Sequence, residues 1–214
     1  MKSKLLQQRE ELWNIISHGA GIILSIIGLI FLILLSVDHR SDYGLIAAIG
    51  FSASMIAVYT ASTAYHVSKF YSHRKQKLFR TLDHISIFYL IAGTYTPFLI
   101  ILLGDGNGKM IMYIIWAIAA FGTLYKLTLG QRFPRFSLML YITMGWVILI
   151  DIKAFSTLTP EHILILILLG GAAYMIGTFF YAKEKIPYNH VIWHVFVLAG
   201  STFHFLAVYE LYRI

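Results

Sequence analysis

Long apolar stretches separated by short polar segments dominate the pattern along this chain. Seven such runs occur, and each is close to the roughly 20 residues that cross about 30 Å of hydrocarbon as a helix. The runs are continuous and lack the alternation of apolar and polar residues, so they predict helices rather than strands. We expect the helices at roughly 14–37, 43–67, 82–103, 109–129, 136–155, 161–182 and 188–210.

No soluble domain or low-complexity linker separates these runs. The pattern therefore predicts an all-α integral membrane protein, a single seven-transmembrane-helix bundle over residues 1–214. Composition supports this class, because 58% of the residues are hydrophobic and 13% are charged, whereas soluble chains average about 25% charged residues. The mean hydropathy is +0.73. Much of the protein surface is expected to face lipid.

The 17 Lys and Arg residues are divided unevenly between the two ends of the predicted helices. The N-terminal tail and the second, fourth and sixth connectors hold 13 of them, and the opposite side holds 4. The positive-inside rule then predicts a cytoplasmic N-terminus and a C-terminus outside. The formal net charge of +7 does not indicate a nucleic-acid partner, because the basic residues occupy short connectors between apolar runs.

His190 and His194 stand four residues apart in the seventh run, which is about one helical turn. Both imidazoles are therefore expected on one face of one helix, where two neutral imidazoles form half of a metal site. A membrane-spanning segment seldom carries such groups for packing alone. The chain has no cysteine, so any metal must be held by histidine, carboxylate or water. The intervening Val191–Trp193 exclude the zincin motif, in which a Glu between the histidines acts as base.

Polar residues from other runs are expected at the same depth. In the predicted topology His66 ends the second run and Asp83 begins the third, both near the cytoplasmic surface. We predict that His66, His190 and His194 bind Zn²⁺ and leave one position for water, as in catalytic zinc sites. Asp83 could take a proton from that water or orient it. Ser62, one turn before His66, could hydrogen-bond a ligand, the water or a substrate carbonyl.

Four further polar residues are expected to support this site. Glu11, Asn14 and His18 open the first run on the same side, and His84 follows Asp83 at about 100° around its helix. Simpler interpretations stay open at this point. An intramembrane histidine often makes an interhelical hydrogen bond, and a buried histidine–aspartate pair can be an ion pair or a proton relay.

Together these motifs resemble the signature of the hemolysin III proteins, bacterial relatives of the progestin and adipoQ receptors, which include the adiponectin receptors. The matching segments are Glu11-x2-Asn14-x3-His18, Ser62-x3-His66, Leu82-Asp83 and His190-x3-His194. The resemblance implies a multi-pass protein of the bacterial plasma membrane, with zinc bound by His66, His190 and His194 and contacted by Asp83 through water. It also implies kinship with alkaline ceramidases, which carry a similar set and hydrolyse lipid amides. One departure is His84, where adiponectin receptors have Tyr.

Three functions are open from the sequence. The favoured one is metal-dependent hydrolysis of a membrane lipid at an amide or ester bond. The second is a pore-forming cytolysin or channel, which needs a polar lining through the bilayer, although segments such as 22–35 and 163–169 are almost wholly apolar. The third is a lipid-sensing, receptor-like protein with a structural zinc. Small residues within 47–64 and 170–173 allow close helix packing, either within a protomer or in a homo-oligomer.

Overall fold

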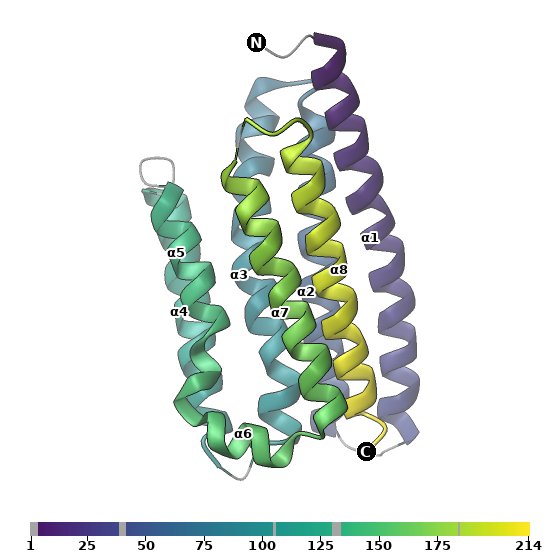
Figure 1. The fold of residues 1–214 in the computed structure, drawn as a ribbon, viewed down its shortest axis with the longest axis vertical. Helices are drawn as coiled ribbons and strands as arrows, with labels where there is room; N and C mark the ends of the chain where they lie inside the picture. The colour runs from purple at the N-terminus through teal and green to yellow at the C-terminus, as the bar shows by residue number, and fades with distance from the viewer. Residues whose placement is uncertain (1–3, 39–41, 105, 130–133, 184) are drawn as a thin grey trace.

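The computed structural model describes residues 4–38, 42–104, 106–129, 134–183 and 185–214. Over these residues every regular element is a helix (Figure 1). Seven helical segments are long and apolar enough to cross a membrane, which confirms the predicted class of seven-helix membrane protein. Lys2, Arg40 and Arg132, three of the basic residues used to predict the topology, lie outside the described residues.

The helices follow the expected order, with one span divided into three pieces. Their bounds are α1 (Lys4–Asp38), α2 (Asp42–Ser68), α3 (His73–Ile101), α4 (Gly108–Thr128), α5 (Pro134–Gly145), the 3₁₀ helix η1 (Val147–Asp151), α6 (Ile152–Leu158), α7 (Glu161–Ala182) and α8 (Asn189–Leu211). Helices α1 and α3 begin well before the expected positions 14 and 82. The reason is that polar helical turns precede the apolar run in both, and hydropathy marks only the apolar section of a helix.

The fifth span is interrupted after Gly145, where α5 gives way to η1. The Tyr95 hydroxyl on α3 donates a hydrogen bond to the Gly145 carbonyl at 2.8 Å and accepts one from the Ile148 amide at 3.3 Å. One side chain thus satisfies two backbone groups near the break, as a non-helical backbone within a bilayer requires. The continuous apolar run did not reveal this break, because hydropathy carries no information about backbone hydrogen bonding.

The most extensive helix contacts in the bundle are those of α2 with α1 and α3 and of α7 with α8. Helix α2 lies between α1 and α3, and α1 also contacts α8. Helix α7 packs against α8, and α4 packs against α3, so that α4 and α5 stand at one edge of the bundle (Figure 1). The start of α1, the end of α2 and the start of α8 share one end of the bundle, and the C-terminus lies at the other end (Figure 1).

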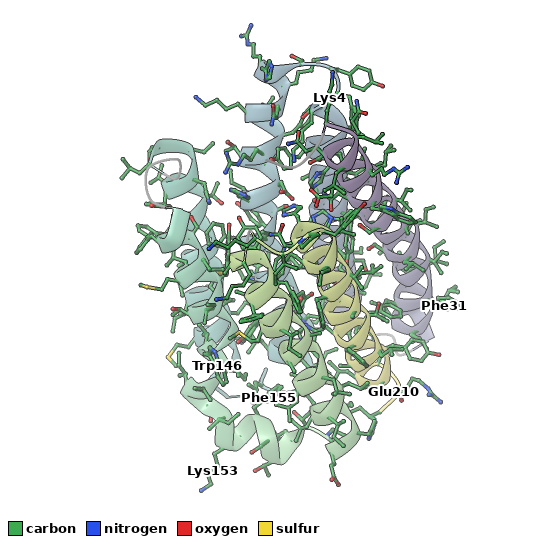
Figure 2. All side chains as sticks on the ribbon, turned by 45° about the horizontal axis from the view of Figure 1, so that its top comes forward. Lys4, Phe31, Trp146, Lys153, Phe155 and Glu210 are labelled. Atoms are coloured by element: carbon green, nitrogen blue, oxygen red, sulfur yellow. The ribbon has the colours of Figure 1, made fainter. Side chains whose placement is uncertain are left out.

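Large apolar side chains cover much of the outer surface. Phe31 on α1 and Trp146 beside α5 are 51% and 56% exposed, and Phe31 lies at the outer edge of the bundle in Figure 2. Figure 2 also places Lys4 at one end of the molecule and Lys153 at the other. An apolar belt between charged ends is the surface expected of a bundle embedded in lipid.

Candidate metal centre

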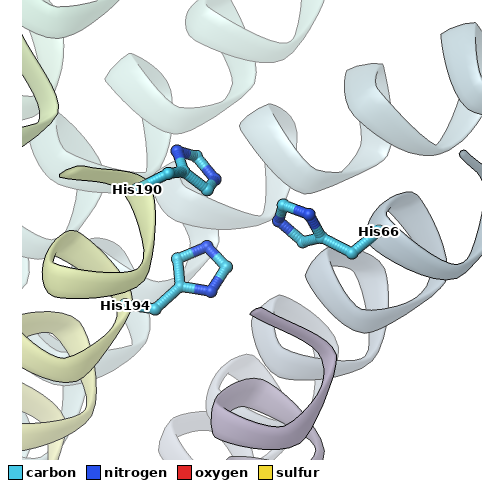
Figure 3. Close-up of side chains that lie close together, drawn as sticks. All are labelled: His66, His190 and His194. Carbon is cyan, nitrogen blue, oxygen red and sulfur yellow. The ribbon is translucent and has the colours of Figure 1, made fainter. Parts of the chain in front are cut away.

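Three histidine side chains from two helices meet at the end of the bundle where α2 ends and α8 begins. His66 lies in the last turn of α2, and His190 and His194 lie in the first two turns of α8. One ring nitrogen of each lies within 4.8 Å of the other two, and the three rings face one another in Figure 3. The ring centroids are 4.6, 4.9 and 5.1 Å apart. These three histidines are positioned to bind a metal ion.

The unpaired nitrogens of this cluster fit metal ligation. Nε2 of His66 and Nε2 of His190 are buried and have no hydrogen-bond partner among the described residues. A buried polar atom without a partner is unfavourable, and a metal ion would satisfy both nitrogens. His66 is 0% exposed and His194 is 2% exposed, so the cluster lies inside the helices rather than on their surface.

A carboxylate holds the opposite edge of the His66 ring. Nδ1 of His66 lies 2.7 Å from Oε2 of Glu11, and Oε1 of Glu11 accepts a hydrogen bond from Nζ of Lys69 at 2.8 Å. When Nδ1 donates to the carboxylate, Nε2 is left with a free lone pair, which is the arrangement typical of metal-binding histidines. Glu11 was expected near the site, whereas sequence reasoning missed Lys69. The signal available for Lys69 was its position about one turn after His66.

His194 is contacted from α1. Its Nδ1 lies 3.5 Å from Oγ of Ser17, and the ring of His18 stacks on it with centroids 3.5 Å apart and planes 13° apart. Both ring nitrogens of His18 and Oδ1 of Asn14 are buried without a hydrogen-bond partner in the described part of the chain. Of the expected supporting residues, His18 therefore lies against His194 through its ring, and Asn14 interacts with His194 through its backbone. Ser17 was not predicted, although it stands next to His18 in the sequence.

Glu10 holds the turn that leads into α8. Its Oε1 accepts a hydrogen bond from the Tyr188 amide at 2.8 Å. Tyr188 has φ 57°, in the left-handed region that residues other than glycine seldom adopt. Two adjacent carboxylates of α1 thus contact the two helices that carry the histidines, with Glu10 at the start of α8 and Glu11 at the end of α2.

Asp83 and Ser62 lie outside the group of three histidines. Both are buried, with 9% and 1% exposure. Asp83 on α3 interacts with Ser62 and with the charge of Lys69, so it faces the last turns of α2. Among the described residues, Oγ of Ser62 has no hydrogen-bond partner at ordinary hydrogen-bonding distance. The structure therefore brings both predicted catalytic residues toward the helix end that carries His66.

His84 has a different set of contacts from those of the histidine cluster. Its Nδ1 lies 3.1 Å from Nζ of Lys126 on α4, and the Tyr141 hydroxyl donates to its backbone carbonyl at 2.7 Å. These contacts face α4 and α5, as expected for a residue about 100° around the helix from Asp83. Lys126 was not predicted as a site residue, because its position near the end of an apolar run is typical of a connector.

The fold and the three histidines define a multi-pass helical membrane protein with a candidate metal centre. Residues 6–205 match the family described as haemolysin-III related. The chain is 42% identical over 200 residues to Hemolysin-3 of Bacillus cereus, covering 94% of this chain and 90% of that protein. It is 38% identical over 201 residues to a Hemolysin-3 homolog of Bacillus subtilis, covering 94% and 93%.

A more distant similarity extends to a human protein. The chain is 27% identical over 205 residues to the human monocyte to macrophage differentiation factor, covering 94% of this chain and 84% of that protein. The chain belongs to the haemolysin-III related family, which confirms the resemblance predicted from its motifs.

Proposed function

We propose that this protein is a zinc-dependent hydrolase that cleaves an amide or ester bond of a membrane lipid. The group of three histidines carries the proposal, because two of its buried Nε2 atoms are unpaired among the described residues and a carboxylate orients His66. Three protein ligands with an open fourth position are typical of catalytic zinc, whereas structural zinc sites are closed by four protein ligands.

His66, His190 and His194 would hold the ion through their ring nitrogens. An all-imidazole donor set suits zinc among the first-row metals, and zinc has no redox chemistry that would compete with hydrolysis. When bound, zinc polarises a carbonyl group and makes a neighbouring water more acidic.

Asp83 and Ser62 supply the remaining chemistry in this proposal. The Asp83 carboxylate takes a proton from the attacking water and returns it to the leaving amine or alcohol. One C–O bond forms at the acyl carbon as the C–N or C–O bond to the leaving group breaks. Oγ of Ser62 has no partner at ordinary hydrogen-bonding distance among the described residues, and in this proposal it donates to the substrate carbonyl. Ser62 and His66 are one turn apart on α2 and therefore share a face.

The depth of the cluster favours a lipid as the substrate. The three histidines lie near one end of helices that are long enough to span a bilayer. This is the level of the linkage between a lipid headgroup and its chains. We place the protein in a bacterial plasma membrane with the cluster toward the cytoplasm, on the basis of the Lys and Arg distribution.

A second candidate, a pore-forming cytolysin, is raised by the name of the Bacillus cereus relative, Hemolysin-3. A conducting path needs polar groups through the thickness of the membrane. Beyond the cluster, α8 carries Ser201 and His204, whereas the outer half of α1 is almost wholly apolar. Dye release from liposomes by the pure protein, lost when Ser201 and His204 are replaced by Ala and Phe, would favour the pore over the hydrolase.

The test of the hydrolase is turnover by the purified, zinc-loaded protein on a panel of lipid amides and esters in mixed micelles. We expect release of fatty acid from at least one lipid class, and a loss of about 10²–10⁴-fold in Asp83→Asn, because that variant lacks the general base. Metal content and helical content should be unchanged in Asp83→Asn. Glu161→Gln, an exposed change at the start of α7, is the matched control. The proposal would be contradicted if no lipid in the panel were hydrolysed, or if Asp83→Asn kept full activity. Full activity in Asp83→Asn is the result expected if the zinc is only structural.

A further inference from the structure

Lys126 is a buried lysine on a membrane-spanning helix. It lies in the last turn of α4, and its side chain is 7% exposed. Its ammonium makes no ion pair with a carboxylate among the described residues, where the ion pairs join Glu11 to His66 and Lys69, and Glu210 to Arg213. A cationic group inside a membrane protein without such a partner is unfavourable and commonly marks a binding site.

Lys126 makes its side-chain contact with the imidazole of His84. Nζ lies 3.1 Å from Nδ1 of His84, so the ammonium donates to that ring nitrogen and the proton of the neutral ring resides on Nε2. The ring is half-buried, and its backbone is fixed by the hydrogen bond from Tyr141 to the His84 carbonyl. The pair therefore offers two further N–H donors from Lys126 and one from His84, together with a positive charge.

The charged residues nearest to this pair in the sequence of α3 are Arg80 and Asp83. Arg80, about one turn before His84 on α3, is exposed and acts electrostatically on both His84 and Lys126. Asp83, next to His84 in the sequence, acts on Lys126 with the opposite sign. Lys126 reaches His84 from α4, and His84 directly follows Asp83 on α3, so the basic pair adjoins the candidate catalytic residue.

We propose that Lys126 and His84, with Arg80 at the edge, form a binding site for an anionic oxygen group, the phosphate of a lipid headgroup. Phosphate oxygens accept several N–H donors and neutralise a buried ammonium. A zwitterionic phospholipid does this less well, because its phosphodiester carries less charge than a phosphomonoester and its choline cation is repelled by Lys126 and Arg80. This inference names anionic lipids as the substrate class of the proposed hydrolase, and to that extent it rests on the proposed function. The binding itself can be measured without turnover.

A purely structural contact is the competing explanation. Asp83 could balance the charge of Lys126 at a distance while Lys126 only joins α4 to α3. In that case, replacing Lys126 changes stability but leaves the preference among lipids unaltered. Selectivity between headgroups is therefore the observable that separates a binding site from a structural contact.

The experiment measures binding of three probes to the full-length protein in a neutral maltoside detergent by calorimetry. The probes are dihexanoyl phosphatidic acid, dihexanoyl phosphatidylcholine and inorganic phosphate. We expect phosphatidic acid to bind more tightly than phosphatidylcholine, and its affinity to fall about tenfold or more in Lys126→Met, because hydrogen bonds to charged groups are strong. Lys126→Arg should retain most of the affinity, and Lys153→Gln, an exposed lysine on α6, should match the wild type.

Three other results of this experiment would contradict the binding site or its assignment to a lipid. Equal affinity for the two lipids, or wild-type affinity in a folded Lys126→Met, would refute the site. Inorganic phosphate that binds as tightly as phosphatidic acid would assign the site to a free anion instead of a lipid. If Lys126→Met does not fold, His84→Gln provides the same comparison, because it removes the ring that orients the ammonium. Selective binding without hydrolysis would leave this site standing while the proposed reaction fails.

Discussion

Glu11 on α1 and His66 on α2 are joined by a contact of 2.7 Å between Oε2 and Nδ1, although 55 positions separate them in the sequence. Lys69 fixes the other carboxylate oxygen at 2.8 Å. A carboxylate held in this way sets both the tautomer and the orientation of a metal-binding imidazole. Helix α1 contributes none of the three histidines, yet its side chains contact two of them, His66 and His194.

Replacement of Glu11 by Gln is expected to weaken metal binding. The variant loses the charge that orients His66, and such changes typically lower metal affinity by about 10–100-fold. Competition with a chromophoric chelator measures the affinity, and circular dichroism reports whether the helices persist. Glu161→Gln should bind metal as the wild type does. Unchanged affinity in Glu11→Gln would show that the carboxylate does not act on the metal centre.

Glu10 and Tyr188 give a second test, because the carboxylate holds a residue in an unfavourable backbone conformation. Glu10→Ala removes a charged acceptor, and we expect a loss of stability of about 1.5–3 kcal/mol and weaker metal binding. Tyr188→Gly relieves about 1–2 kcal/mol of left-handed strain, so it should restore part of the stability of Glu10→Ala. Thermal unfolding in detergent measures both. Further destabilisation in the double variant would contradict this relation.

Two glycines of α1 form a matched pair. A Cβ at Gly21 would lie 2.6 Å from the ring of Tyr59, whereas a Cβ at Gly19 would meet no atom within 4 Å. The Tyr59 ring in turn contacts the His18 ring edge to face, with centroids 5.1 Å apart. Gly21→Ala should therefore destabilise the bundle by about 1–3 kcal/mol through overpacking. Gly19→Ala should be neutral or stabilising by up to about 1 kcal/mol, from helix propensity. The same thermal measurement compares them, and equal effects would be incompatible with the packing described.

The inferred orientation can be tested with single cysteines, because the chain contains none. Lys75 lies in the first turn of α3, just after the end of α2 that carries His66, and Lys153 lies on α6 at the other end of the molecule (Figure 2). Both are exposed. In intact spheroplasts, a membrane-impermeant maleimide should label Lys153→Cys and leave Lys75→Cys unlabelled until the membrane is opened. The reverse pattern would place the cluster on the outer side.

The sequence predicted the fold class because hydrophobic length alone distinguishes a membrane helix. It also singled out His66, His190 and His194, since spacing and topology brought them to one depth, and the structure places their ring nitrogens within 4.8 Å. The start of α1 at Lys4 was not predictable in the same way, because its first turns are polar. The interruption of the fifth span after Gly145 depends on a hydroxyl from a distant helix and has no local signal.

Residues that act through other residues were the hardest to predict. Ser17, Lys69 and Glu10 carry no motif of their own, and their roles arise only when α1 packs beside α2 and α8. Lys126 is similar, because its burial depends on the contact between α4 and α3. A single sequence shows which side chains are polar, but it does not show which of them come into contact when the helices pack.

Metal content of the detergent-purified protein, beside the double variant His190→Ala/His194→Ala, tests the central claim most directly. We expect about one zinc ion per chain in the wild type, as a three-histidine site predicts, and none in the double variant with its helical content intact. Elemental analysis after loading and exhaustive washing provides the number. A folded wild-type protein that retains no metal would contradict the metal centre, and with it the proposed hydrolysis.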